Sequence, residues 1–218
     1  MSFHTELLES RRMLSASIND DGVLEVVGTS QKDVIVISVN ADNAAKLDAV
    51  VNGEVSTFDV ADITGGVSVR GLGGKDRIVV DEANGEVDLN CTLSGGNGKD
   101  DLAGGSGDDE LDGGTGKDRL SGNAGDDVIR GGNGRDHLDG GFGDAYLVGG
   151  RGADALHGGA GDDDLDGGQG KDHLFGGDGN DDFAGWDSAS ERQDDTDGDD
   201  GDNGLGAQDD VDPLDLLD

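Results

Sequence analysis

Apolar side chains recur at every ninth position through residues 95–184. Each stands between two mostly polar residues and follows a glycine-rich hexad. Glycine tolerates positive φ and close backbone approach, so each hexad predicts a turn. The next three residues predict a strand about 10 Å long with its middle side chain facing inward. The ten inward positions are Leu102, Leu111, Leu120, Ile129, Leu138, Leu147, Leu156, Leu165, Leu174 and Phe183.

The nonapeptide period predicts how these short strands assemble. Two turn-strand units close one flattened coil, so repeat n stacks on repeat n+2 at about 4.8 Å. Ten repeats then make five coils, a roll roughly 24 Å tall with an aliphatic interior. The sequence therefore predicts an all-β fold, a parallel β-roll (β-solenoid) of tandem nonapeptides over 95–186, with a β-rich cap before it and a disordered acidic tail after it.

The sixth position of the repeat carries an aspartate in nine of the ten copies. Carboxylates stacked at strand spacing repel one another unless a cation lies between them. Calcium suits such a column because it accepts six to eight oxygen ligands in flexible geometry, whereas magnesium demands a tighter octahedron. The competing interpretation is a Gly/Asp-rich disordered linker, which is expected for the chain without calcium. One edge of the roll would carry Asp100, Asp118, Asp136, Asp154 and Asp172. The other edge would carry Asp109, Asp127, Ala145, Asp163 and Asp181.

The repeat GGxGxDxUx resembles the RTX (hemolysin-type) calcium-binding repeat family, similar to the C-terminal β-roll of serralysin-like proteases. The resemblance implies calcium ions held by turn carbonyls and position-six aspartates of two stacked turns. Because Ala145 interrupts one edge, we expect about six strong sites in the regular block. Asp144 lies one residue earlier, where it should point into solvent unless a local shift lets it substitute.

Residues 21–94 predict longer strands, at 23–27, 33–40, 46–51, 55–60 and 67–70. Asn52 and Gly53 between two of them predict a hairpin turn. Residues 71–79 form a degenerate nonapeptide, which adds Asp76 as a candidate calcium ligand out of register with Asp100. Val87, Leu89, Cys91 and Leu93 alternate with other residues, as in a strand with one inward face, which favours a buried core thiol at Cys91. We interpret this region as a β-rich cap, with a small independent β-sandwich as the alternative.

Both ends of the chain differ from the repeats. Residues 8–14 resemble the LEPR-xLL segment near the N-termini of planctomycete exported proteins, so residues 1–20 are assigned as an export or sorting segment. An amphipathic starter helix is the alternative. Phe183 and Trp186 could plug the open end of the roll. Residues 187–218 predict an acidic disordered tail, whose end, 213–218, weakly resembles the C-terminal signals of type I secretion.

Composition narrows the function classes. The chain has 218 residues, a net charge of −35, 32% hydrophobic and 3% aromatic residues. So few apolar residues make an ordinary core improbable unless metal replaces part of it. The negative charge excludes nucleic acid as a partner, because phosphate binding needs a positive face. No run reaches the 18 or so apolar residues of a transmembrane segment.

No catalytic constellation is found in the sequence. His137, His157 and His173 fall on outward positions without an HExxH pairing, so we expect solvated histidines and no enzyme activity. We predict a secreted or cell-surface protein that binds several calcium ions and has a structural or binding role toward an unidentified surface or matrix partner. The alternative is a secretion or C-terminal module, or a fragment, of an RTX toxin or secreted hydrolase.

Overall fold

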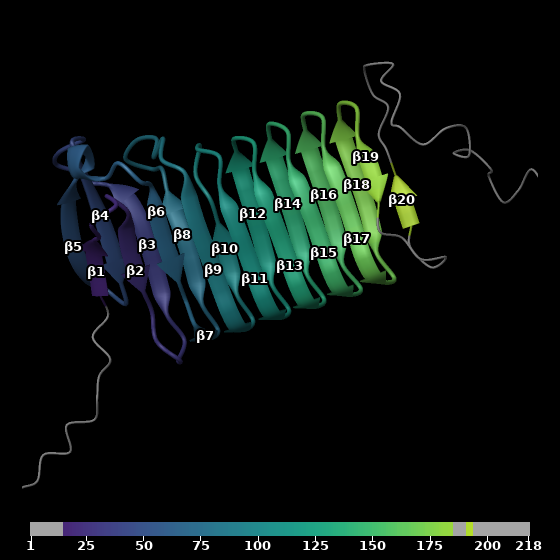
Figure 1. Ribbon diagram of the computed structural model, residues 1–218, viewed down its shortest axis with the longest axis horizontal. Helices are drawn as coiled ribbons and strands as arrows, with labels where there is room; N and C mark the ends of the chain where they lie inside the picture. Colours follow the sequence, from purple (N-terminus) through teal and green to yellow (C-terminus); the bar gives the residue numbers. More distant parts are fainter. Residues whose placement is uncertain (1–14, 185–190, 194–218) are drawn as a thin grey trace, which may run out of the picture.

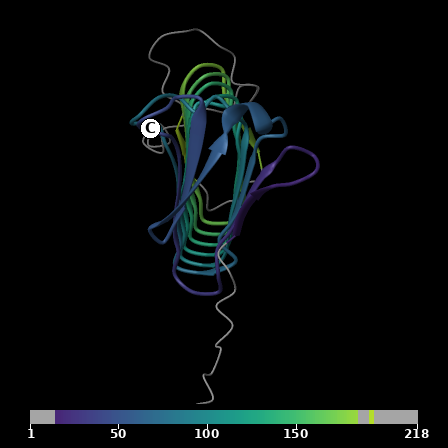
Figure 2. The same cartoon turned by 90° about the vertical axis from the view of Figure 1, so that its left-hand side faces the viewer.

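A computed structural model describes residues 15–184 and 191–193 of the chain. Within these residues two parallel-stacked sheets face each other along the whole molecule (Figure 1), and the end-on view shows the coils superposed as a flattened tube (Figure 2). The first sheet has the order β1 (Ser15–Ile18), β2 (Leu24–Val27), β6 (Val67–Arg70), β9 (Cys91–Gly98), β11 (Glu110–Gly116), β13 (Val128–Gly134), β15 (Tyr146–Gly152), β17 (Asp164–Gly170) and β19 (Asp182–Ala184), with β7 (Gly73–Gly74) paired to β9. The second has the order β20 (Glu191–Gln193), β18 (His173–Asp178), β16 (Ala155–Ala160), β14 (His137–Phe142), β12 (Arg119–Ala124), β10 (Asp101–Ala103), β8 (Arg77–Asp81), β3 (Val34–Val39), β4 (Lys46–Val51) and β5 (Glu54–Asp59).

Strand register confirms the predicted stacking of repeat n on repeat n+2. In the first sheet Leu111 pairs with Ile129 in parallel register, and in the second Leu120 pairs with Leu138. Both pairs are separated by 18 residues, two nonapeptides. The all-β parallel roll predicted from the period is therefore correct.

The interior consists of the position-eight side chains. All ten are buried, from Leu111 at 0% exposure to Phe183 at 8%. Burial of one such side chain stabilises the fold by about 1.5–3 kcal/mol. Because only one residue in nine faces inward, the apolar contribution per residue is small, and the turns must supply the remaining stability.

The region before the repeats is hydrogen-bonded into the same two sheets. Ile35 of β3 pairs with Ile78 of β8, which lies next to Leu102 of β10. The hairpin β4–β5 and the short helix η1 (Val60–Asp62) are inserted between β3 and β6. Asn52 and Gly53 at the hairpin have φ of 52° and 89°, which confirms the predicted turn. Antiparallel strands form the N-terminal edge of each sheet. In the first sheet β1 pairs with β2, and in the second β4 pairs with β3 and β5 with β4. These strands cover sheet edges that would otherwise be open to pairing with other chains.

Cys91 is buried at 1% exposure, as the prediction of a core thiol requires. Its Sγ donates to the Leu89 carbonyl oxygen at 3.2 Å. Burial raises the pKa of the thiol, and the neighbouring Asp109 carboxylate raises it further. The thiol is therefore protonated and inert near neutral pH.

The ends of the chain lie largely outside the described residues. These include the 8–14 segment, Trp186 of the proposed plug and most of the acidic tail. One part of that tail is described: β20, at Glu191–Gln193, pairs in parallel with β18 and extends the second sheet. Across residues 15–184 and 191–193 there is no helix long and apolar enough to cross a membrane.

Candidate metal centre

The turns of the roll depend on two glycines with left-handed backbone. In the turn of residues 113–118, Gly114 has φ of +95° and Gly116 has φ of +155°. A Cβ added to Gly116 would lie 1.4 Å from the Gly98 carbonyl oxygen of the preceding coil. Only glycine allows this approach, so carbonyl oxygens of successive turns stack closely beneath one another. Oxygen ligands from two coils are thereby brought together.

The position-six aspartates form two buried columns. The first column runs along one edge of the roll and the second along the other, in the grouping predicted from the sequence. All nine repeat aspartates are at most 2% exposed. They are Asp100, Asp118, Asp136, Asp154 and Asp172 in the first column, and Asp109, Asp127, Asp163 and Asp181 in the second. Burial at the same position in every coil gives the carboxylates one common orientation.

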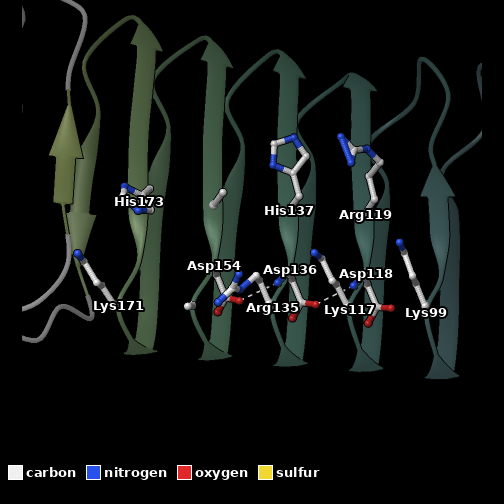
Figure 3. A pocket seen from close by; sticks show the side chains of 12 residues that line it. Lys99, Lys117, Asp118, Arg119, Arg135, Asp136, His137, Asp154, Lys171 and His173 are labelled. Carbon is white, nitrogen blue, oxygen red and sulfur yellow. Dashed lines mark hydrogen bonds between the residues drawn. The ribbon is translucent and has the colours of Figure 1, made fainter.

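Hydrogen bonds between coils fix that orientation. The Asp100 backbone N–H donates to Asp118 Oδ1 at 2.8 Å. The Asp118 N–H donates in the same way to Asp136 Oδ1, and the Asp136 N–H to Asp154 Oδ1, each at 2.8 Å (Figure 3). The second column repeats the pattern, with the Asp163 N–H donating to Asp181 Oδ1 at 3.0 Å. One oxygen of each carboxylate is thus used to join coils. In Asp118 and Asp136 the other oxygen, Oδ2, has no hydrogen-bond partner.

That second oxygen, Oδ2, is the clearest sign of a metal site. In seven aspartates it is buried and has no hydrogen-bond partner: Asp76, Asp100, Asp118, Asp127, Asp136, Asp154 and Asp163. An unpaired buried carboxylate oxygen costs about 1–3 kcal/mol or more. A row of them is explained by a cation that binds along the column. The aspartates therefore fit calcium, together with the stacked turn carbonyls.

The pKa values report the same unfavourable burial. Burial, together with the neighbouring column carboxylates, raises the pKa of Asp118 and Asp154 to about 6. Burial likewise raises the pKa of Asp127 and Asp163 to about 7, and that of Asp76 to about 6. Negative charge in the columns is costly without a cation.

The donor set argues against a transition metal. No group of three or more His, Cys, Asp or Glu side chains is close enough to hold an ion within residues 15–184. Zinc sites need such groups, because their ligands are mostly nitrogen and sulfur. Calcium needs oxygen alone, and backbone carbonyls supply it as well as carboxylates do.

The first column extends further back than the sequence predicted. The Asp76 N–H donates to Asp100 Oδ1 and the Asp33 N–H donates to Asp76 Oδ1, both at 2.8 Å. Asp76 thus belongs to the column despite its broken register. Asp33 was missed, although Gly28, Asp33 and Ile35 stand at positions one, six and eight of a nonapeptide without its other glycines.

The first aspartate of each column is satisfied by protein groups. Asp33 Oδ2 accepts from the Thr29 N–H at 2.5 Å, and Asp33 Oδ1 accepts from the Asn52 side-chain amide at 2.7 Å. In the second column Asp109 Oδ2 accepts from the Gly105 N–H at 2.7 Å, and its Oδ1 accepts from the Cys91 N–H at 2.7 Å. Both columns therefore begin with a carboxylate whose two oxygens both accept hydrogen bonds from protein groups.

Ala145 interrupts the second column, as the sequence indicates. Its N–H still donates to Asp163 Oδ1 at 2.7 Å, but its methyl group offers no oxygen to the coil before it. Asp144 is exposed, and its carboxylate accepts from the Asp162 N–H at 2.9 Å outside the column. Asp144 therefore does not replace the missing carboxylate.

The raised pKa values predict that a lower pH stabilises the calcium-free fold but weakens calcium binding. A carboxyl whose pKa rises from 3.8 to about 6 or 7 on folding stabilises the fold when protonated, so this stability is lost as pH rises through that range. The calcium-free roll should consequently be most ordered below about pH 6. Calcium requires deprotonated ligands, so its affinity should fall as pH drops from 7 to 5. Circular dichroism in chelator at pH 5 and 8, with calcium titrations at both, checks this. Equal order at both pH values would contradict it.

Comparison with known families agrees with the geometry. The RTX calcium-binding nonapeptide repeat matches in four copies, over residues 92–111, 112–147, 139–174 and 157–187. No curated protein and no solved structure matches the chain. The matched residues contain all nine repeat aspartates of the two columns.

Proposed function

Since residues 92–187 are RTX calcium-binding nonapeptide repeats folded as a parallel β-roll, we propose that calcium completes this fold outside the cell, where the roll has a structural or binding role. The observation that carries the proposal is the set of seven buried Oδ2 atoms without a partner. Because these buried oxygens have no partner within the protein, calcium that binds to them would stabilise the folded roll.

Column residues would hold the ions as pairs from successive coils. On the first edge the pairs are Asp100 with Asp118, Asp118 with Asp136, Asp136 with Asp154 and Asp154 with Asp172. On the second edge they are Asp109 with Asp127 and Asp163 with Asp181. Bound calcium supplies positive charge between carboxylates and accepts the stacked turn carbonyls. The chain contributes fixed carboxylate orientation, through the N–H to Oδ1 bonds, and a pre-formed row of carbonyl oxygens.

An extracellular setting supports this coupling. Extracellular calcium modules bind with dissociation constants near 10⁻⁴ to 10⁻³ M. At about a millimolar calcium each site then adds roughly 0.4 to 1.5 kcal/mol, and several together approach a domain's net stability. The cytosol holds far less free calcium, so the roll would be ordered only after export. The binding partner would then belong to the cell surface or matrix.

Calcium stoichiometry tests the proposal. Equilibrium dialysis against about a millimolar calcium should find about six ions bound per chain, with magnesium at the same concentration binding far less. Binding of calcium in proportion to net charge alone, with no preference over magnesium, would point to a diffuse counterion layer and refute the proposed sites.

Absence of catalysis is part of the same proposal. The columns hold neither a nucleophile beside a base nor an open position on a nitrogen-bound metal, which hydrolases require. Purified protein with calcium should therefore leave casein, lipid esters and polysaccharides uncleaved. Turnover that survives repurification and disappears when one residue of the 21–94 region is replaced would contradict this prediction.

A further inference from the structure

The fifth position of the repeat carries opposite charge on the two edges of the roll. On the first edge, beside the first aspartate column, it is cationic in six coils; on the second it is acidic or amide. The first-edge side chains are Lys32, Lys75, Lys99, Lys117, Arg135 and Lys171. Those of the second edge are Asp108, Asp126, Asp144, Asp162 and Asn180. All of these side chains are exposed, so the segregation is a property of the surface.

Arg77 and Arg119, at position seven of the adjoining strands, add to the cationic edge. Eight of the fifteen Lys and Arg residues of a chain with net charge −35 thus lie along this edge, six of them in the position-five line and two beside it. Even scatter over the surface would not produce this concentration. Between Lys99 and Lys171 the line borders a groove of about 470 Å³, with Arg119, His137 and His173 on its far side (Figure 3).

The same turns carry a second row of hydrogen-bonding side chains, neutral except for one arginine. At position three the first edge has Asn97, Thr115, Asn133, Arg151 and Gln169, which stack in register from coil to coil. Position three of the second edge is mixed, with Ala124, Phe142 and Ala160 among its residues. Cations beside amides and a hydroxyl, repeated at about 4.8 Å, make a surface for a polymer that alternates charged and hydroxyl groups.

We propose that the first edge binds an extended acidic polysaccharide. Its carboxylate or sulfate groups would lie against the position-five cations, and its hydroxyls against the position-three amides. One coil rise is comparable to one sugar residue of an extended glycan, so successive sugars meet equivalent position-five side chains except at the coil that carries Ala153. A single-stranded nucleic acid fits less well, because its recognition relies on aromatic stacking and the groove has no Phe, Tyr or Trp.

A second copy of the chain is also less suited to this edge. Its acidic row would face the cations, but those carboxylates are already engaged. Asp108 Oδ1 accepts from the Asp126 N–H, and Asp126 Oδ1 from the Asp144 N–H, each at 3.0 Å. Two chains that each carry a charge of −35 also repel one another over longer distances. A glycan bears its charge at a lower density and brings hydroxyls for the amide row.

Calcium should control this binding, and here the inference rests on the proposed function. Asp118, Asp136 and Asp154 line the groove beneath the cations. Without calcium these carboxylates offset the lysine and arginine charges. With calcium between them the first edge becomes strongly positive, whereas the second edge stays negative, because its two proposed ions balance only the column carboxylates and not the four position-five aspartates. Glycan affinity should therefore rise with calcium occupancy.

Fluorescence anisotropy with a labelled uronate hexasaccharide, too short to be gelled by calcium, tests the proposal. The full chain in millimolar calcium should bind it, and a neutral hexasaccharide should not bind. The variant Lys99→Gln, Lys117→Gln, Arg135→Gln, Lys171→Gln should raise Kd roughly tenfold or more, since exposed ion pairs each contribute a modest amount. The matched variant Asp108→Asn, Asp126→Asn, Asp144→Asn, Asp162→Asn keeps each Oδ1 acceptor and should leave Kd unchanged or lower.

Calcium stoichiometry and circular dichroism of every variant separate the possible outcomes. A wild-type chain that binds calcium and folds but ignores the uronate probe overturns the polysaccharide site and leaves the proposed function intact. A chain that binds no calcium refutes the proposed function itself. Calcium-dependent self-association in sedimentation, lost equally in both variants, would assign the cationic edge to a second copy and overturn the proposal. Loss of uronate binding in the cationic-edge variant alone, with calcium stoichiometry unchanged, supports it.

Discussion

Removal of calcium is expected to unfold the roll. Residues 95–184 contain 21 acidic and 7 basic residues, and nine of the acids are buried in two columns. Burial of charged carboxylates without a counter-charge costs several kcal/mol per ion, while net domain stability is only about 5–15 kcal/mol. With one inward apolar side chain per nonapeptide, the core buries too little apolar surface to offset that repulsion.

Far-ultraviolet circular dichroism checks this result. The full chain should give a spectrum without regular structure in excess chelator at pH 8, and a β-rich spectrum in millimolar calcium. Magnesium should restore little β-structure at the same concentration, because the turn carbonyls and carboxylates form a flexible site of high coordination number. A β-rich spectrum that excess chelator leaves unchanged would contradict the coupling of binding and folding.

Replacement of Asp136 by alanine should damage two calcium sites at once. Asp136 lies between two candidate sites, one with Asp118 and one with Asp154. Asp136→Ala removes one carboxylate from both and leaves the buried Asp118 N–H without its acceptor, a loss of about 1–3 kcal/mol beyond that of the ions. We expect two fewer ions and a lower melting temperature at fixed calcium.

Two further variants separate metal binding from hydrogen bonding. Asp136→Asn keeps an oxygen that can accept from the Asp118 N–H but removes the charge, so it should lose calcium with a smaller loss of stability. Asp126→Asn, at an exposed position of the second edge, should leave the calcium count unchanged. Full calcium stoichiometry in Asp136→Ala, measured by equilibrium dialysis, would show that this carboxylate is not a ligand.

The reciprocal substitution, Ala145→Asp, should add calcium. It restores the carboxylate that the second column lacks and gives the Asp127 N–H the acceptor that the corresponding N–H has in other coils. Bound calcium should rise by one or two ions and the melting temperature should increase by several degrees, as expected for about 1 kcal/mol in a domain of this size. A decrease in melting temperature with no added calcium would mean that the second edge has no site beside Ala145.

The repeating part of the roll could be predicted from the sequence because each inter-coil contact is made by residues at fixed spacing. An apolar residue at every ninth position predicted the strands, and two nonapeptides per coil predicted the pairing of Leu111 with Ile129. The columns followed from the same spacing. Asp76 was found through its own nonapeptide, although 24 residues separate it from Asp100.

The N-terminal coils could not be predicted in the same way. Asp33 lies 43 residues before Asp76, because the β4–β5 hairpin is inserted between the two turns. Its turn also lacks the two left-handed glycines, since Asn52 and Thr29 hold the carboxylate in place of stacked carbonyls. A pattern search that relies on glycine misses a position whose hydrogen bonds come from side chains far along the chain.

Cys91 shows a second limit of the sequence pattern. Alternation correctly placed it in the core, but its N–H also donates to Asp109 Oδ1, as an aspartate N–H does elsewhere in the second column. Cys91 therefore occupies a position-six place without a carboxylate. The start of the second column depends on this three-dimensional register and on the Gly105 N–H, neither of which has a local sequence signal.

Anomalous scattering from crystals of the calcium-bound protein tests most directly whether the position-six carboxylates control binding. Strong peaks are predicted in the first column at the 100/118, 118/136, 136/154 and 154/172 gaps, and in the second column at 109/127 and 163/181. The two gaps beside Ala145 should be weak or empty. Equal peaks at all eight gaps, or peaks that avoid the aspartate columns, would contradict the account.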